Sequence, residues 1–345
     1  MDDFSMSHIA DDQLFTDGDR VRGKVVVITG AANGIGRETA LRFGAYGAKV
    51  VIGDLDITGA QKVVEEINRA GSGSAVCIKC NVTNWDDQVA MFELAMKTYG
   101  TVDVVVPNAG VSEVGSFQTL TFKDGKPVKP KLATLEVNLY GVLYSAHLGW
   151  HYLQQGQQDG DLKALIFIGS VASWQGIPSG EMYTGSKHAV LGVMRALHPI
   201  AEIKGIRVAC IHPFFADTAI VPIPVKLILA GIPLTPVPRV AGAIFKAATD
   251  PDMTTSGSAY LLLDDGPVFR VPKEEFKLGV YKMIDDRANA ARAILKGTQA
   301  WLLFFKDVWR ITGKPIVAAG TAAAVSKLAW DNRAAIQAYI TSVTS

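Results

Sequence analysis

The sequence predicts an α/β fold built on a parallel β-sheet, and three features of the chain lead to this class. The first apolar run, residues 24–28, is continuous and β-branched rather than alternating, which is typical of a strand buried on both faces of a parallel sheet. A glycine-rich turn and a segment with helical spacing follow this run directly. The same order of strand and helix then repeats along the chain, as expected for parallel strands joined by helices.

The composition excludes several classes of function. Hydrophobic residues make up 49% of the 345 residues, so a sizeable core can form, and the net charge of +1 argues against a nucleic-acid partner. The six histidines and three cysteines are not clustered, so we expect neither a metal site nor a disulfide framework. Cys77 and Cys80 have redox-pair spacing but lie in a strand-like run, which favours packing. The acidic first twenty residues lack a signal-peptide core, which predicts an intracellular, cytoplasmic protein.

The chain divides into three parts. Residues 1–22 contain six aspartates and no helical apolar stripe, so we expect a loosely held N-terminal arm. Residues 23–267 carry the repeated strand and helix pattern. Residues 268–345 mix charges with two apolar segments, 301–305 and 316–330, both shorter than the roughly 20 residues that span a membrane. We expect a C-terminal helical extension that packs on the body, on a partner subunit or on a membrane surface.

The turn after the first strand, Thr29–Gly36, has the spacing G-x-x-x-G-x-G. Glycines here allow the backbone to approach a pyrophosphate at the positive end of the following helix. The next strand, residues 49–53, ends in Asp54, whose carboxylate can accept both hydroxyls of an adenosine ribose and would repel a 2′-phosphate. No Arg or Lys lies within the turn or directly after Asp54, so the sequence favours NAD over NADP. A capping role for Asp54 is the alternative, but Asp56 is better placed for it.

The alternation continues with a helix (58–70), a strand (75–80), a helix (84–99) and a strand (102–106). This last strand runs into Asn108, Ala109 and Gly110, whose small size would let a ligand ring lie against the strand end. A loop, residues 116–131, precedes a long predicted helix, residues 131–155. Asn138 is an amide in an otherwise apolar part of that helix, where it could bond to backbone or to water.

The stretch from Ser170 to Lys187 carries the clearest chemistry. Ser170 follows a predicted buried strand, residues 164–168, so its hydroxyl lies just past the carboxyl end. Tyr183 and Lys187 are four residues apart and share one face of a helix. An ammonium beside a phenol favours the phenolate and lowers the phenol pKa from about 10 toward neutrality. Solvated helices show the same spacing by chance, so the assignment depends on the surrounding motifs.

An apolar segment with five prolines, residues 219–240, follows a helix (190–203) and a strand (206–211). The prolines argue against one regular element. The position after a strand end predicts a lid, and its apolar character predicts an apolar substrate. A membrane or subunit contact is the competing interpretation. Residues 259–263 supply the final strand.

Together these motifs resemble the short-chain dehydrogenase/reductase family over about residues 22–266. The resemblance implies a Rossmann-type doubly wound sheet of about seven parallel strands, in the order 3-2-1-4-5-6-7, with helices on both faces. It implies a catalytic tetrad of Asn138, Ser170, Tyr183 and Lys187. It also implies cofactor contacts from Gly30, Asn33, Gly34, Ile35, Gly36, Asp54, Asn81, Val82, Asn108, Ala109, Gly110, Tyr183, Lys187, Pro213, Phe215 and Thr218.

Two positions depart from the family pattern. Asn81 precedes Val82 where the family usually has Asp, and its amide could still bond to adenine. Phe214 replaces the glycine that usually follows Pro213, which restricts the backbone and places a ring near the nicotinamide. The long loop before Asn138 and the C-terminal extension resemble fungal enzymes similar to 15-hydroxyprostaglandin dehydrogenases.

The resemblance implies an NAD-dependent oxidoreductase that interconverts a secondary alcohol and a ketone. The expected substrate is bulky and apolar, such as a terpenoid, steroid, polyketide or lipid. In this mechanism Tyr183 is the general acid/base and Ser170 holds the substrate oxygen. Lys187 lowers the tyrosine pKa and binds the nicotinamide ribose, while Asn138 positions a water linked to Lys187. The alternatives are an NADPH-dependent ketone reductase and a non-catalytic cofactor-binding protein. The family also implies a homodimer or homotetramer.

Overall fold

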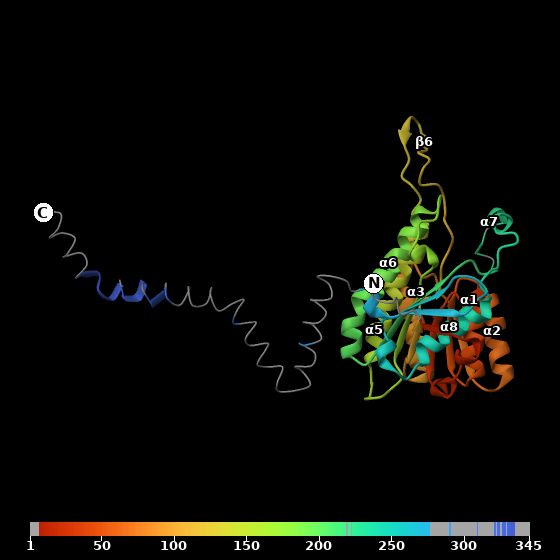
Figure 1. The fold of residues 1–345 in the computed structure, drawn as a ribbon, viewed down its shortest axis with the longest axis horizontal. Helices are drawn as coiled ribbons and strands as arrows, with labels where there is room; N and C mark the ends of the chain where they lie inside the picture. The colour runs from red at the N-terminus through yellow and green to blue at the C-terminus, as the bar shows by residue number, and fades with distance from the viewer. Residues whose placement is uncertain are drawn as a thin grey trace. The chain divides into compact units, whose positions relative to one another are not determined.

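The computed structural model describes residues 7–218, 220–221 and 223–276, and single positions or short runs between residues 290 and 334. The chain forms two compact units, residues 1–276 and 277–345 (Figure 1). In the second unit the described positions from residue 321 to residue 334 are almost all helical. The apolar segment 301–305 lies outside the described residues, as does much of segment 316–330. Within the described part of the chain, no helix is long and apolar enough to cross a bilayer.

The first unit is organised around a twisted, mostly parallel sheet (Figure 1). Among the described residues the sheet has nine strands. Seven of these strands are adjacent and parallel, in the order β4-β3-β2-β5-β8-β9-β10. This order is the one implied by the family resemblance, so the predicted fold class is confirmed. The parallel strands are β2 (Val25–Thr29), β3 (Lys49–Asp54), β4 (Ser74–Lys79), β5 (Val104–Val106), β8 (Ala164–Ile168), β9 (Arg207–Pro213) and β10 (Ala259–Leu262).

Two antiparallel strands extend the sheet beyond β10. The strand β11 (Val268–Val271) pairs with β10, and β1 (Ser7–Ile9) pairs with β11. Residues 7–22 of the predicted N-terminal arm are therefore held against the sheet and α8 rather than loosely, and the sheet continues past residue 267. Two of the six aspartates that suggested a loosely held arm form ion pairs with α8 (Val237–Thr249): Lys246 bonds to Asp17 and Arg239 to Asp11, both at 2.7 Å.

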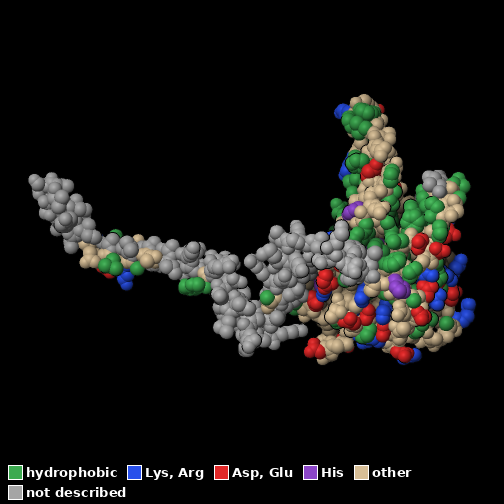
Figure 2. Space-filling model, viewed as in Figure 1, with side chains coloured by type: hydrophobic (Ala, Val, Ile, Leu, Met, Phe, Trp, Pro, Cys, Tyr) green, Lys and Arg blue, Asp and Glu red, His purple; other side chains and the backbone are tan. Residues whose placement is uncertain are grey.

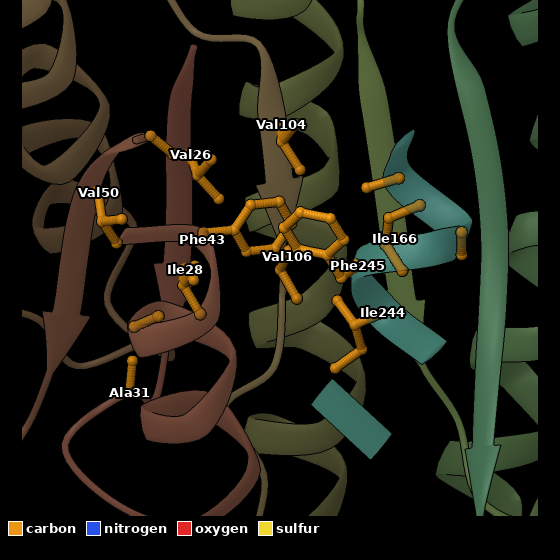
Figure 3. Packing of buried hydrophobic residues seen from close by; sticks show 14 of the residues in the cluster. Val26, Ile28, Ala31, Phe43, Val50, Val104, Val106, Ile166, Ile244 and Phe245 are labelled. Atoms are coloured by element: carbon orange, nitrogen blue, oxygen red, sulfur yellow. The ribbon is translucent and has the colours of Figure 1, made fainter. Parts of the chain in front are cut away.

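Helices cover both faces of the sheet and bury two separate layers of apolar side chains. One layer lies under α1 (Gly34–Ala45), α2 (Ile57–Ala70) and α8, and the other under α3 (Trp85–Tyr99), α5 (Val142–Gln154) and α6 (Glu181–Ile203). Alternate residues of β2 point into each layer, which explains why the strand is apolar from Val25 to Ile28. Figure 3 shows Phe43 of α1 and Phe245 of α8 packed over Val104 and Val106 of β5.

The segment predicted as one helix over residues 131–155 has three parts. The short α4 (Ala133–Leu135) leads into a π-helical turn, η3 (Glu136–Gly141), and only then into α5. The preceding loop contains a hairpin that the sequence analysis missed, with β6 (Phe122–Lys123) and β7 (Lys126–Pro127) joined at Asp124 and Gly125. Both turn residues have positive φ, as a two-residue hairpin turn requires.

Residues 219–240, called the lid below, contain the short helix α7 (Ile223–Ile228) and the start of α8. Thr235 donates its amide hydrogen to the Phe215 carbonyl at 2.9 Å and forms an isolated bridge with Ala216. Lys226 of α7 pairs with Asp217 at 2.6 Å. The lid is thus fastened at its base to the chain that leaves β9.

Candidate active site

The turn between β2 and α1 has a backbone that favours glycine. Gly30 and Gly34 have φ angles of 68° and 57°, in the left-handed region. A Cβ on Gly36 would lie 2.1 Å from the Gly30 carbonyl oxygen. The side chain of Asn33 makes no capping hydrogen bond, which leaves amides in the first turn of α1 available to another acceptor. Such a helix end is suited to binding phosphate.

The end of β5 braces this turn from the side. Asn108 Nδ2 donates to the carbonyl oxygens of Thr29 at 3.0 Å and Gly30 at 2.8 Å. The Ala109 amide donates to Thr29 Oγ1 at 3.1 Å. A Cβ on Gly30 would lie 2.7 Å from Ala109 Cα. Small residues therefore allow the two strand ends to approach closely and fix the shape of the turn.

Asp54 is the last residue of β3 and Asn81 lies just after β4, and both are held by local hydrogen bonds. Asp54 Oδ2 accepts from the Ala32 amide at 2.8 Å, and Oδ1 accepts from the Asp56 amide at 2.9 Å. Each oxygen retains a lone pair for a ligand hydroxyl. Asn81 Oδ1 accepts from the Thr83 amide and hydroxyl, so the Nδ2 group is the donor available to a ligand.

Ser170, Tyr183 and Lys187 come together where β8 meets α6. Lys187 Nζ donates to the Ile168 carbonyl at 2.9 Å and lies 5.7 Å from the centre of the Tyr183 ring. The Ser170 side chain hydrogen-bonds to Tyr183, and its Oγ also accepts from the Ala172 amide at 3.1 Å. A hydroxyl, a phenol and an ammonium are therefore within one small region, as the spacing of the sequence predicted.

Burial dominates the electrostatics of these groups. It raises the pKa of Tyr183, and the hydrogen bond with Ser170 opposes this shift only in part. Burial also lowers the pKa of Lys187, to about 8. The tyrosine pKa is thus displaced in the direction opposite to our expectation, because the phenolate loses more solvation than the hydrogen bond restores. Lys187 can exchange a proton close to neutral pH.

Asn138 is completely buried in the π-helical turn η3. Its Nδ2 donates to the Val111 carbonyl and its Oδ1 accepts from the Val111 amide, both at 2.8 Å. Its side chain does not line the cavity described below. Both polar atoms instead fix the chain just after Gly110. A π-helical turn is often found at functional sites, and the amide explains why a polar residue lies in this helix.

These elements enclose one cavity of ≈ 1130 Å³ at the carboxyl ends of the parallel strands. Its wall includes every residue that the sequence predicted to bind the cofactor. Of the predicted catalytic residues, Ser170, Tyr183 and Lys187 line the cavity and Asn138 does not. The volume exceeds the roughly 300–1,000 Å³ of a pocket for a drug-sized ligand. There is therefore room for a dinucleotide together with a substrate.

The end of β9 supplies a second wall of the cavity. Pro213, Phe214 and Phe215 line it, and the two phenylalanine rings meet edge to face at 5.0 Å. Thr218 also lines the cavity and lies opposite Gly34, where its methyl group is 3.4 Å from the position of a Cβ. Phe214 thus lines the same cavity as Tyr183, and a narrower substrate pocket at this position stays a prediction.

Two titratable residues at this site escaped the sequence analysis. His212 is fully buried and its Nδ1 lies 3.0 Å from the Ser170 carbonyl, which can only accept, so Nδ1 carries a proton. Burial lowers the pKa of His212 to about 3, and the ring stays neutral. Glu113 lines the cavity and accepts a hydrogen bond from the Tyr183 amide. The sequence offered two signals for them: a histidine directly after the predicted strand 206–211, and an acid three residues after Gly110.

The residues present fit a nicotinamide dinucleotide. The first turn of α1 offers amides for a pyrophosphate, Asp54 offers acceptors for a ribose, and Asn81 offers a donor for a base. Among the described residues no cluster of His, Cys, Asp or Glu could hold a metal ion. Cys77, Cys80 and Cys210 are free thiols, and burial raises the pKa of Cys80 to about 12.

Comparison with known proteins agrees with this geometry. The family model described as short chain dehydrogenase matches residues 24–222, more than half of the chain. The chain belongs to the short-chain dehydrogenase family. It is 31% identical over 276 residues to the short-chain dehydrogenase/reductase ascJ of Acremonium egyptiacum, covering 78% of this chain and 84% of that protein. It is 34% identical over 203 residues to cyclohexanol dehydrogenase of an Acinetobacter species, covering 59% and 76%.

A solved structure of 3-ketoacyl-(acyl-carrier-protein) reductase from Brucella melitensis complexed with NADH is also similar. The TM-score is 0.60 at 26% identity, with 71% of this chain and 97% of that chain covered. This short-chain dehydrogenase is therefore an oxidoreductase that acts on CH–OH groups and uses a nicotinamide cofactor. The cavity at the strand ends is the candidate site for that chemistry.

Proposed function

We propose that this short-chain dehydrogenase interconverts a bulky, apolar secondary alcohol and its ketone with NAD. The observation that carries the proposal is the convergence of Ser170, Tyr183 and Lys187 on one cavity that also contains Asp54 and the glycine-rich turn. A bound nicotinamide ring supplies the site that accepts or gives the hydride. The residues of the chain bind and orient the substrate and the cofactor, and they move the proton.

In the oxidation direction Tyr183 accepts the hydroxyl proton of the substrate, and in reduction it returns that proton. Ser170 donates its hydroxyl hydrogen to the substrate oxygen and stabilises the charge that develops there. Lys187 Nζ lies 5.7 Å from the centre of the Tyr183 ring, where a protonated ammonium would favour the phenolate. Asn138 acts through the backbone of Val111, which positions the loop between β5 and the finger described below.

The substrate class follows from the wall of the cavity around Tyr183. The lid contributes Val221, Val225 and Leu229, and the end of β9 contributes Phe214 and Phe215. These side chains offer no hydrogen-bonding group to a substrate, so selectivity there depends on apolar contact and shape. A lipophilic secondary alcohol such as a terpenoid, steroid, polyketide or lipid derivative fits this chemistry.

Asp54 supports NAD rather than NADP. Its carboxylate is held at the end of β3 by two backbone amides and presents negative charge where a 2′-phosphate would lie. Arg37 is paired with Glu66 at 2.6 Å. The alternative has one observation in its favour, because Arg37 and Lys62 line a small polar recess next to Asn33. NADPH binding tighter than NADH would show that this recess holds the phosphate.

We also propose that the protein is a homodimer or homotetramer assembled through η3, α5 and α6. Tyr140, Ile200 and Ile203 on these elements are more than half exposed, although they are large and apolar. A monomeric mass in sedimentation equilibrium would refute this assembly.

The discriminating experiment for the activity is Tyr183→Phe. We expect this variant to lose turnover of lipophilic secondary alcohols, measured as NADH absorbance, while NADH binding still quenches its fluorescence. Unchanged turnover would remove Tyr183 from the mechanism. A wild-type protein that binds NADH but turns over no alcohol or ketone would favour a cofactor-binding protein without catalysis.

A further inference from the structure

Residues 115–131, called the finger below, project from the body as a narrow hairpin. Figure 1 shows β6 rising well above the end of the first unit from which α7 also projects. All residues of the finger, from Gly115 to Lys131, are exposed. Gln118 Nε2 donates to Glu181 at 2.6 Å and ties the finger to the start of α6.

The finger carries apolar side chains that have no place in the core. Phe117, Leu120 and Phe122 are 63%, 61% and 63% exposed. Phe122 pairs with Pro127 across the hairpin, so both side chains lie on one face, while Lys123 and Lys126 pair on the other. Figure 2 shows hydrophobic side chains gathered at the tip, with a basic group beside them. A projecting hairpin has no reason to expose phenylalanine to water unless something covers it.

The lid presents a second apolar surface at the same end of the molecule. Ile223 and Leu227 of α7 are 75% and 72% exposed, whereas Val225 and Leu229 line the cavity. Gly115, at the base of the finger, lines the same cavity. The finger and the lid therefore both border the cavity that contains Tyr183, and both turn apolar side chains outward around it.

Charge indicates what covers these surfaces. The finger contains four lysines, Lys123, Lys126, Lys129 and Lys131, and a single acid, Asp124. Two copies that met through their fingers would bring like charges together, which argues against self-association. Apolar side chains next to lysines are the combination that binds anionic lipid surfaces, where the apolar groups enter the interface and the lysines contact headgroups.

We propose that the finger and the lid dock this protein on an anionic lipid surface. In this orientation the cavity mouth faces the bilayer, and an apolar ligand can pass from lipid to the cavity without crossing water. The docking itself does not depend on the proposed dehydrogenase activity, so its test uses vesicle binding as the readout.

The experiment measures flotation of the full chain with vesicles of phosphatidylcholine, alone or mixed with phosphatidylserine. Two finger variants are compared, F117S/F122S and K123E/K126E. Their matched controls are Leu263→Ser and Lys97→Glu, which change an exposed apolar residue just after β10 and an exposed lysine of α3. The substituted finger residues are all exposed, and an unchanged melting temperature would show that the variants fold.

We expect wild-type protein to bind the mixed vesicles, with each finger variant binding at least about tenfold more weakly and both controls unchanged. Failure of the wild type to bind either vesicle would overturn the proposal. Equal binding by wild type and finger variants would overturn it as well, because the contact would then lie elsewhere in the chain. A change in oligomeric mass without a change in vesicle binding would show that the finger joins protein copies instead.

Discussion

The carboxylate of Glu113 accepts a 2.7 Å hydrogen bond from the backbone amide of Tyr183. This bond joins the chain that leaves β5 to the first turn of α6, whose own N-cap residue, Gly180, has no side chain to offer. A carboxylate is stabilised at a helix N-terminus by the partial positive charge there. The other oxygen of Glu113, Oε1, is buried without a hydrogen-bond partner. Glu113 therefore positions Tyr183 at some cost to its own solvation.

Replacing Glu113 tests this positioning role. We expect E113A to lower the free energy of unfolding by about 1 kcal/mol, as loss of a helix cap does, and to reduce kcat more than it changes KM for the cofactor. E113Q keeps an acceptor for the Tyr183 amide and should retain most of the activity. Equal losses in both variants would show that the charge of Glu113, rather than its hydrogen bond, matters.

The buried ammonium of Lys187 makes stability depend on pH in a defined window. Its pKa is lowered from 10.5 to about 8 in the folded protein. Between these values the unfolded chain binds more protons than the folded chain, so stability from this group rises with pH. Below about pH 8 Lys187 is protonated in both the folded and the unfolded chain. The full cost of burying its ammonium then lowers the free energy of unfolding.

Lys187→Met should remove that cost. We expect the variant to be more stable than the wild type at pH 7, by up to about 3 kcal/mol before the loss of the bond to Ile168 is counted. The advantage should shrink as pH rises from 8 to 10.5, and turnover should be absent throughout. Urea unfolding at several pH values measures this, with Lys97→Met as an exposed control. A stability difference between Lys187→Met and the wild type that stays constant with pH would contradict the lowered pKa of Lys187.

Much of the fold followed from the sequence because its cause is local. Continuous apolar runs such as those of β2 and β8 are buried on both faces, and this is a property of the residues themselves. The glycines of the cofactor turn and the spacing of Tyr183 and Lys187 are equally local. For this reason the cavity gathers nearly all the residues that the motifs indicated.

What the sequence did not show depends on partners distant in the chain. The acidic arm appeared solvated until α8 supplied Lys246 and Arg239 as counter-charges. The amide of Asn138 could have bonded to water or to backbone, and only the fold brings Val111 to it. The hairpin of the finger is a different case, because Asp124-Gly125 between strand-like residues is a local signal that was available.

Gly36→Ala is expected to abolish cofactor binding. A Cβ at this position would lie 2.1 Å from the Gly30 carbonyl oxygen and 2.4 Å from Asn108 Nδ2, so the turn and its brace would have to move apart. Gly192 of α6 is a matched control, since a Cβ there meets nothing within 4 Å. Gly192→Ala should leave NADH binding unchanged and raise stability by up to about 1 kcal/mol. Normal NADH affinity in Gly36→Ala would show that the turn does not hold the cofactor.

The pair formed by Lys163 and Asp103 should be the most sensitive ion pair outside the site. Their side chains are 2% and 5% exposed and lie 2.9 Å apart, and Asp103 also accepts a 2.8 Å hydrogen bond from the Val25 amide at the start of β2. Lys163→Met leaves the Asp103 carboxylate buried without its counter-charge, which typically costs about 3–5 kcal/mol.

The exposed pair of Arg22 and Asp19 provides the comparison, because the two side chains are 69% and 94% exposed. Arg22→Met should change the free energy of unfolding by less than about 1 kcal/mol. The two variants can be compared by urea unfolding, with equal slopes against denaturant as the sign that the native state is unchanged. A similarly small change in the free energy of unfolding for Lys163→Met and Arg22→Met would mean that water reaches Asp103 when Lys163 is lost. The large difference we expect would identify this pair as a main tie between β5, β8 and the first strand of the parallel sheet.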